Sequence, residues 1–291
     1  MSLFSLNRRR HAKDRIATGL IYVSFVIALM PLLSLLYTAL TNGLARLDAE
    51  FFSSSMRNVV GAGGGALHAI IGTVEITLLA ALISVPIGLL TAIYLVEYGR
   101  GRLAKAVTVF VDVMTGIPSI VAGLFAFALF ALIFGPGVRM GFAGAVALSL
   151  LMTPVVVRSA EEMLKLVPNE FREASYALGV PKWLTVLKVV IPSASAGIIT
   201  GVMIAISRVI GETAPLLIVA GFTQSVNYNP FDERMMTLPV FVYYSYSSQG
   251  ADAQSYIDRA WAGALVLIIL VLALNLGARA LSAYFNRKLA R

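Results

Sequence analysis

The sequence predicts an all-α membrane protein with six transmembrane helices. Composition is the first observation: of 291 residues, 58% are hydrophobic and only 13% are charged, whereas soluble domains carry about 25% charged residues. The second is that the apolar residues gather in long runs, and a helix needs about 20 of them to cross a bilayer. The third is that Lys and Arg lie mainly between these runs, as they do in the short loops of membrane proteins.

Six apolar runs are candidate spans. The first follows a basic N-terminal segment, residues 1–15, and is longer than the apolar part of a secretory signal, which has about 7–15 residues. We therefore expect an uncleaved span. The fourth is short and ends at Arg158. Pro and Gly interrupt several runs, which predicts a packed bundle around a pathway. The predicted spans are Ile16–Thr41, Ala69–Val96, Leu103–Phe134, Phe142–Val157, Ala194–Gly221 and Ala260–Ala283.

The distribution of Lys and Arg predicts the orientation. Fifteen of these residues lie in the N-terminal segment, in the loop after the second span, in residues 165–188 and in the tail 286–291, against five in the loops on the other side. Because positive loops stay in the cytoplasm, both termini are expected to be cytoplasmic and residues 16–285 to form the membrane domain. The five on the external side are Arg46, Arg57, Arg139, Arg234 and Arg259.

Several functions are disfavoured by what the sequence lacks. It has no cysteine and only two histidines, so we exclude disulfides and thiol catalysis and expect no metal site. The glycine run Gly61–Gly65 lacks the Gly-Lys-Ser/Thr ending of a phosphate-binding loop and predicts a flexible external turn. We therefore expect neither an enzyme nor a bound cofactor. The net charge of +8 is attributed to membrane loops rather than to nucleic-acid binding.

A polar stretch, Glu170–Ala194, interrupts the apolar runs. Good helix formers end at Gly179, a residue type that favours helix ends. Pro181 can start a second helix, which Pro192 should end before the fifth span. The stretch thus predicts two short helices joined by a glycine corner on the cytoplasmic face. An alternative is a helix pair that simply lies at the membrane interface. The charges expected to face water are Glu170, Arg172, Glu173 and Lys182.

Within this stretch, "EASYALGV" followed by "VVIP" resembles the EAA motif of ABC importer permeases. Ser175 stands where that motif has a second Ala, and Ile191 where it has Leu. The resemblance implies the type I ABC importer permease fold, with residues 168–192 as a coupling-helix pair that docks into a separate cytoplasmic ATPase. The coupling residues implied by the motif are Glu173, Ala174, Gly179 and Pro192.

Three segments narrow the resemblance. "DVMTGIPSIVAGLFAF", "RSAEEMLKLVPNEFREAS" and "SRVIGETAPLLIVAGF" together resemble the A-type permease subunits of bacterial high-affinity phosphate importers. That family implies half of a translocation pathway, with a C-type permease subunit, two ATPase copies and an external phosphate-binding protein as partners. A permease for another oxyanion, of the molybdate or sulfate type, is an alternative. So are a proton-coupled secondary transporter and a membrane enzyme, although no catalytic constellation is visible.

Charges within the predicted spans are the candidate pathway residues. A charge at the bilayer centre costs about 2.5–3.5 kcal/mol on insertion scales, so it usually faces a bundle interior. Arg208 and Glu212 are four residues apart and are expected to pair on one helix face. Arg208 can bind phosphate, and Glu212 would keep that binding weak; the alternative is a structural ion pair. Arg158 is a second candidate, whose alternative is snorkelling to the cytoplasmic face. Glu75 and Asp112 are both candidates for a helix-packing partner of an arginine, the sequence does not choose between them, and neither is expected to be a ligand.

Overall fold

The computed structural model describes residues 3–247 and 252–289, and this part of the chain folds into helices and loops without a β-strand. Five of its helices are long and apolar enough to cross a membrane, and a sixth span forms if one bent pair counts as a single span. The predicted all-α membrane fold is therefore confirmed. Residues 1–2 and 290–291 of the predicted terminal segments lie outside the described residues. The helices are α1 (Leu3–Gly43), α2 (Ala49–Ser53), α3 (Leu67–Ile93), α4 (Gly101–Thr115), α5 (Ser119–Phe134), α6 (Gly141–Lys165), α7 (Asn169–Ala177), α8 (Lys182–Thr185), α9 (Ile191–Val209), α10 (Ala214–Val219), α11 (Leu238–Ser247) and α12 (Ala253–Leu289), with a 3-10 turn η1 (Leu44–Arg46) and two π-helical stretches, η2 (Tyr94–Tyr98) and η3 (Val186–Val190).

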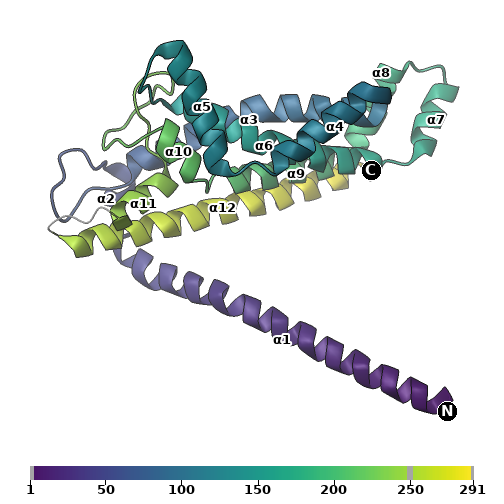
Figure 1. The fold of residues 1–291 in the computed structure, drawn as a ribbon, viewed down its shortest axis with the longest axis horizontal. Coiled ribbons are helices and arrows are strands. Elements are labelled where there is room, and N and C mark those ends of the chain that lie inside the picture. The colour runs from purple at the N-terminus through teal and green to yellow at the C-terminus, as the bar shows by residue number, and fades with distance from the viewer. Residues whose placement is uncertain (1–2, 248–251, 290–291) are drawn as a thin grey trace.

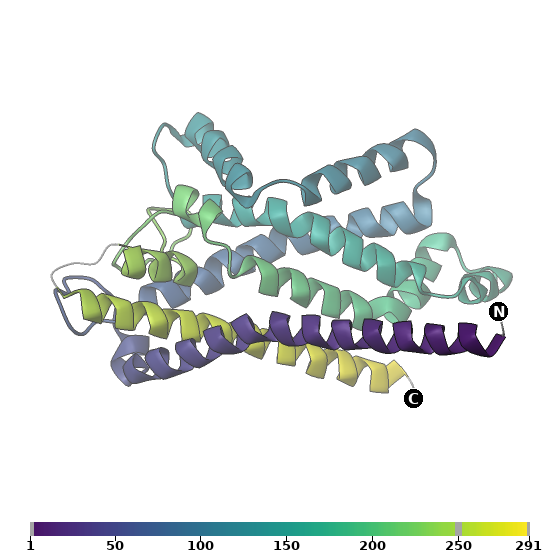
Figure 2. The same ribbon diagram turned by 60° about the horizontal axis from the view of Figure 1, so that its bottom comes forward.

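Four helices form the body of the bundle. α6 packs between α3 and α9, and α9 packs between α6 and α12 (Figures 1 and 2). Small residues allow this close packing, as is usual between membrane helices. A Cβ added to Gly88 of α3 would lie 2.7 Å from Val156 of α6, and one added to Gly201 of α9 would lie 2.5 Å from the Cβ of Ser159.

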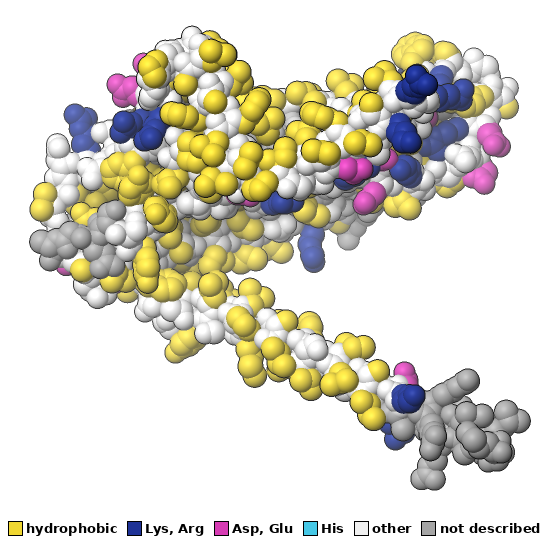
Figure 3. Space-filling view, viewed as in Figure 1, with side chains coloured by type: hydrophobic (Ala, Val, Ile, Leu, Met, Phe, Trp, Pro, Cys, Tyr) yellow, Lys and Arg dark blue, Asp and Glu magenta, His cyan; other side chains and the backbone are white. Residues whose placement is uncertain are grey.

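The two ends of the bundle differ. The chain termini lie at the end that carries α7 and α8, which we call the α7 end (Figures 1 and 2). The connections 44–66, 135–140 and 220–237 lie at the opposite end, which we call the loop end. Figure 3 shows Lys and Arg side chains gathered at both ends, with a mainly hydrophobic surface between them. This distribution is expected of a bundle that crosses a bilayer.

Helix α1 stands apart from the bundle. In Figure 1 it leaves at an angle, and it packs mainly on α12 near its own C-terminal end. None of its most apolar 18-residue window is buried. So large an apolar surface requires lipid or another subunit to cover it.

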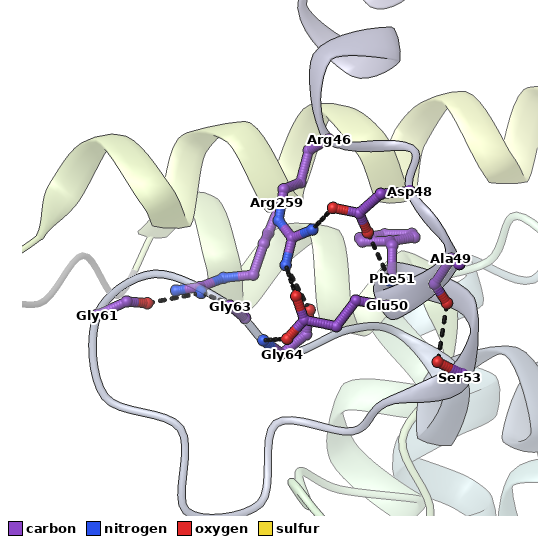
Figure 4. A network of polar contacts seen from close by, with 10 residues as sticks. All are labelled: Arg46, Asp48, Ala49, Glu50, Phe51, Ser53, Gly61, Gly63, Gly64 and Arg259. Atoms are coloured by element: carbon purple, nitrogen blue, oxygen red, sulfur yellow. Dashed lines mark hydrogen bonds and ion pairs between the residues drawn. The ribbon is translucent and has the colours of Figure 1, made fainter.

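A polar network fastens the loop end (Figure 4). Arg46 pairs with Asp48 and donates to the carbonyl oxygen of Gly64 at 2.8 Å. The backbone N–H of Phe51 donates to Asp48 and holds the pKa of that carboxyl below its ordinary value. From α12, the buried Arg259 donates to two carbonyl oxygens of the glycine run, at 2.8 and 2.9 Å. The run is thus a turn that two arginines hold in place.

The structure corrects the third and fourth predicted spans. The third is bent by 107° between α4 and α5, because Pro118 has no N–H and disfavours helical geometry at the preceding residue. The fourth is not short: α6 runs for 25 residues and does not end at Arg158. Glu161 pairs with Arg158 and Lys165 at i,i+3 and i,i+4, and such pairs support a continuing helix.

The fifth predicted span begins earlier and then breaks. The chain is helical from Lys182 to Val209, so the prediction that Pro192 ends a separate second helix is wrong. The π-helical η3 immediately precedes Pro192 and rearranges the backbone hydrogen bonds where the proline removes a donor. After Val209 the helix stops, and α10 begins only at Ala214, with Pro215 in its first turn.

Candidate functional site

The corner after α7 has the geometry predicted from its glycine. Gly179 has φ +77°. Its N–H donates to the carbonyl oxygen of Tyr176 at 2.9 Å, and the N–H of Val180 donates to that of Ser175 at 3.2 Å. These two bonds form a Schellman motif, in which glycine takes the left-handed position at no steric cost. The predicted glycine corner is confirmed.

A buried pair of hydroxyl groups joins the two sides of this corner. The Oγ of Ser175 and the Oγ1 of Thr185 lie 2.8 Å apart, and both residues are buried. Ser175 is the residue that departs from the second Ala of the EAA motif. It is therefore a bridge from α7 to α8 rather than merely a small substitute.

A buried ion pair holds the start of α7 on the bundle. Two nitrogens of Arg172 lie 2.8 and 3.0 Å from the carboxylate of Glu97 in η2, whose side chain is 4% exposed. Lys182 donates to the backbone carbonyl of Glu97 and lies 4.9 Å from the ring centroid of Tyr98. The prediction that Arg172 and Lys182 face water is thus wrong, because the buried carboxylate of Glu97 holds Arg172 inward and its backbone carbonyl holds Lys182.

The outer surface of the corner is left exposed. Glu173 and Ala174 are exposed on α7, and the large apolar side chains of Leu178 and Trp183 are 83% and 59% exposed. Pro192, which the motif groups with them, is half-buried inside the continuous helix. Exposed apolar side chains beside charges, on a corner fixed by internal contacts, make a surface suited to a protein partner.

Arg208 lies in the last turn of α9, and Glu212 lies within the break between α9 and α10. Because α9 ends at Val209, they do not share a helix face. The predicted ion pair does not form, and neither side chain has a hydrogen bond or ion pair with any described residue. Arg208 is exposed and Glu212 is half-buried. One residue before Arg208, the hydroxyl oxygen of Ser207 is buried and has no hydrogen-bond partner among the described residues.

Packing between α9 and α6 gives the depth of the break. Gly197 lies against Met163 and Gly201 against Ser159, so a step of four residues along α9 matches a step of four back along α6. Continued at the same spacing, this register places Arg208 level with about residue 152. Met152 is in the middle of the 25-residue helix α6. The unpartnered arginine therefore lies near half the depth of the bundle.

Arg158 has a different environment. It forms an ion pair with Asp112 of α4, and its Nη1 lies 2.7 Å from Glu161, which also accepts a hydrogen bond from Lys165 at 2.7 Å. Asp112 is thus the packing partner of an arginine, as the sequence predicted for one of its two membrane carboxylates. The other, Glu75, keeps one carboxylate oxygen buried without a partner among the described residues.

Comparison with known proteins places these features in a family. The family described as "Binding-protein-dependent transport system inner membrane component" matches residues 84–291, which include the α7 corner and the helix break. The chain belongs to this family. The permease is 45% identical over 276 residues to the phosphate transport system permease protein PstA 1 of Mycobacterium tuberculosis, covering 94% of this chain and 90% of the relative.

Other relatives agree with this assignment. The phosphate transport system permease protein PstA of Haemophilus influenzae is 38% identical to the permease over 271 residues, which are 93% of this chain and 94% of the relative. A chain of a bacterial alginate ABC transporter, solved with an alginate-bound periplasmic protein, has a TM-score of 0.64 at 14% identity and covers 94% of this chain and 96% of its own. A chain of the MetNI methionine ABC transporter has a TM-score of 0.59 at 19% identity, covering 75% and 95%. The predicted importer permease fold is confirmed.

Proposed function

We propose that the permease is a transmembrane subunit of an ATP-driven phosphate importer and forms half of its translocation pathway. The observation that carries this proposal is Arg208, an exposed and unpartnered guanidinium at mid-depth, in a chain whose relatives are named as phosphate permeases. Facing lipid there would cost about 2.5–3.5 kcal/mol on insertion scales. The exposed face of Arg208 therefore belongs to a polar pathway between this subunit and a second permease.

The break in the fifth span provides the groups that would contact the anion in this pathway. Discontinuous membrane helices mark binding sites near the midplane in many transporters, because backbone groups freed at the break can face a substrate. Arg208 presents a planar fork of donors that fits phosphate oxygens. Glu212, within the break, repels the anion and keeps its binding weak enough for release. Arg158, already paired with two carboxylates, is the secondary candidate on this pathway.

The α7 corner is the proposed coupling site. We assign docking of a cytoplasmic ATPase to the exposed surface around Glu173, Ala174 and Gly179, with ATP hydrolysis in that partner and no cofactor in this chain. Pro192 shapes the helix that carries the corner into the membrane. The proposed assembly contains a C-type permease subunit, two ATPase copies and an external phosphate-binding protein. The excess of Lys and Arg in loops at the α7 end supports a cytoplasmic location for that end and for both termini.

Reconstitution tests the proposal. The complete complex, copurified on a tag on this chain and placed in liposomes with ATP inside, should take up radiolabelled phosphate when loaded phosphate-binding protein is outside. Excess sulfate or molybdate should leave uptake unchanged. Uptake of one of those anions in place of phosphate would favour the other oxyanion permeases. Transport by the purified chain without an ATPase would favour a secondary transporter.

A further inference from the structure

A second pair of arginines lies at the loop end, beyond the helix break. Arg139 and Arg234, together with Gly137, Phe222, Thr223 and Glu233, line an open pocket of about 410 Å³. Neither guanidinium has a hydrogen bond or ion pair within the parts of the chain that the structure describes. Figure 3 shows Lys and Arg side chains gathered on the loops beside α5 and α10.

The backbone holds the two arginines together. Gly221, at the end of α10, has φ +79°, and a Cβ there would lie 3.1 Å from the Cδ of Arg139 and 3.3 Å from that of Arg234. Glycine suits this position because of its positive φ, and a side chain here would also crowd the stems of both arginines. The segments that carry them are tied to α10, because the N–H of Met140 donates to Val219 and that of Met235 donates to Ala220, both at 3.1 Å.

The loop that carries Arg234 is also fixed in an unusual shape. The side-chain amide of Asn227 donates to the carbonyl oxygens of Asp232 and Arg234 at 2.8 and 3.2 Å. Between these two residues, Glu233 has φ +52°, a left-handed conformation that residues with a side chain rarely adopt. Strain of this kind gathers at binding sites, where the surroundings over-determine the local geometry.

Two other arginines at this end of the molecule have partners within the chain. Arg46 forms ion pairs with Asp48 and Glu50, and the Nη1 of Arg259 donates to two carbonyl oxygens of the glycine run, although its Nε and Nη2 have no hydrogen-bond partner among the described residues (Figure 4). Arg139 and Arg234 share their pocket with a carboxylate, that of Glu233, yet no ion pair forms between them in the described structure. Two free guanidiniums around one pocket are suited to a doubly charged tetrahedral oxyanion.

We infer that this pocket is an outer receiving site for phosphate, occupied before the anion reaches Arg208. The inference rests on the proposed function. Helix α10, which has six residues and so is about 9 Å long, joins the pocket at Gly221 to the break at Glu212. An anion leaving the external binding protein meets the arginine pair first. The carboxylate of Glu233 in the same pocket keeps its affinity low, so that the anion moves on.

Residue-by-residue chemical protection tests the site in the native complex. The complex without its soluble binding protein is treated with phenylglyoxal, which modifies free guanidiniums, and modification rates are read by mass spectrometry. Phosphate at millimolar concentration should slow modification of Arg139 and Arg234 by about tenfold relative to chloride of equal ionic strength. Exposed Arg57, whose side chain has no partner among the described residues, is the matched control and should be unaffected. Equal rates at all three arginines with and without phosphate would overturn the inference.

Uptake by variants separates a phosphate site from a docking site. At saturating binding protein, the double change Arg139→Gln with Arg234→Gln should lower phosphate uptake about tenfold, with the half-saturating concentration of binding protein changed less than about twofold. The Arg57→Gln variant should match wild type. Uptake that recovers at higher binding-protein concentration would assign the pair to carboxylates of that protein and contradict the inference. Should the double variant not assemble, protection of the wild-type complex decides. Failure of wild-type phosphate uptake would instead reject the proposed function.

Discussion

The α7 corner and the helix break use charge in opposite ways. At the corner, Arg172 and Lys182 turn inward onto Glu97. At the break, Arg208 lies in the last turn of α9 and Glu212 lies in the non-helical segment that follows, and neither side chain has a partner in the described structure. A paired charge builds a rigid shape, whereas an unpartnered charge at membrane depth requires a partner from outside the chain. This difference is the reason why we propose a mechanical role for the corner and an anion site at the break.

Arg208, which is unpartnered in the described structure, and Arg158, which is paired, allow this difference to be tested within the membrane domain. Replacing Arg208 by Gln should lower phosphate uptake about a hundredfold, because it removes a charged donor from the anion site. Replacing Arg158 by Gln should cost less than about threefold, because Asp112 is half-exposed and Glu161 keeps Lys165 as partner. Initial rates of radiolabelled uptake check both variants, with copurification of the ATPase as the control for assembly. A larger loss at Arg158 would reverse the assignment.

The buried pair at the corner should show the next largest effect, on stability rather than on the anion. Changing Arg172 to Gln leaves the 4%-exposed carboxylate of Glu97 without its charge partner, which costs about 3–5 kcal/mol for a buried pair. Thermal unfolding of the purified complex should shift downward and copurification of the ATPase should weaken. Arg100→Gln, a change at an exposed arginine of the same end, is the control. Equal unfolding temperatures for the two variants would show that the Arg172–Glu97 ion pair does not stabilise the corner.

Two glycines with positive φ, one at the corner and one outside it, allow the effect of backbone strain on coupling to be measured separately from its effect on stability. A Val at Gly179 must adopt φ +77° with no atom within 4 Å of its Cβ, so its cost is conformational, about 1–2 kcal/mol. Gly101 has φ +71° and equally open surroundings, so Val there carries a similar cost outside the corner. We expect both variants to insert into the membrane and to lose similar stability, but only Gly179→Val to lose ATP-driven uptake. Similar uptake by both would contradict a specific role for the corner in coupling.

Sequence reasoning succeeded where the signal is local. A glycine after a run of helix formers predicted the Schellman corner at Gly179, because the left-handed position itself selects the residue type. It failed where a contact spans the chain: Arg172 and Glu97 are 75 residues apart, and nothing in the pattern around either one names the other. The bridge from Ser175 to Thr185 joins residues only ten apart, and it was missed for another reason: the motif compares single positions rather than pairs.

The predicted helix boundaries were wrong where a proline can either end a helix or lie within one. Pro192 was expected to end a helix, but a π-helical stretch before it accommodates the missing donor and the helix continues. Arg208 and Glu212 were expected to share a face because the apolar run continues through them. The break that separates them depends on how α10 packs against α5, where a Cβ on Gly123 would lie 2.6 Å from the Cα of Pro215. That tertiary contact is not visible in hydropathy.

The double variant Arg208→Gln with Glu212→Gln tests the central claim most directly. If the two residues served only as a structural pair, removing both charges would restore a balanced break and uptake would return. The structure shows them without a mutual ion pair, and the account assigns Arg208 to the anion. We therefore predict that radiolabelled phosphate uptake stays about a hundredfold below wild type in the double variant, while the ATPase and the second permease still copurify. Full uptake by the assembled double variant would contradict the account.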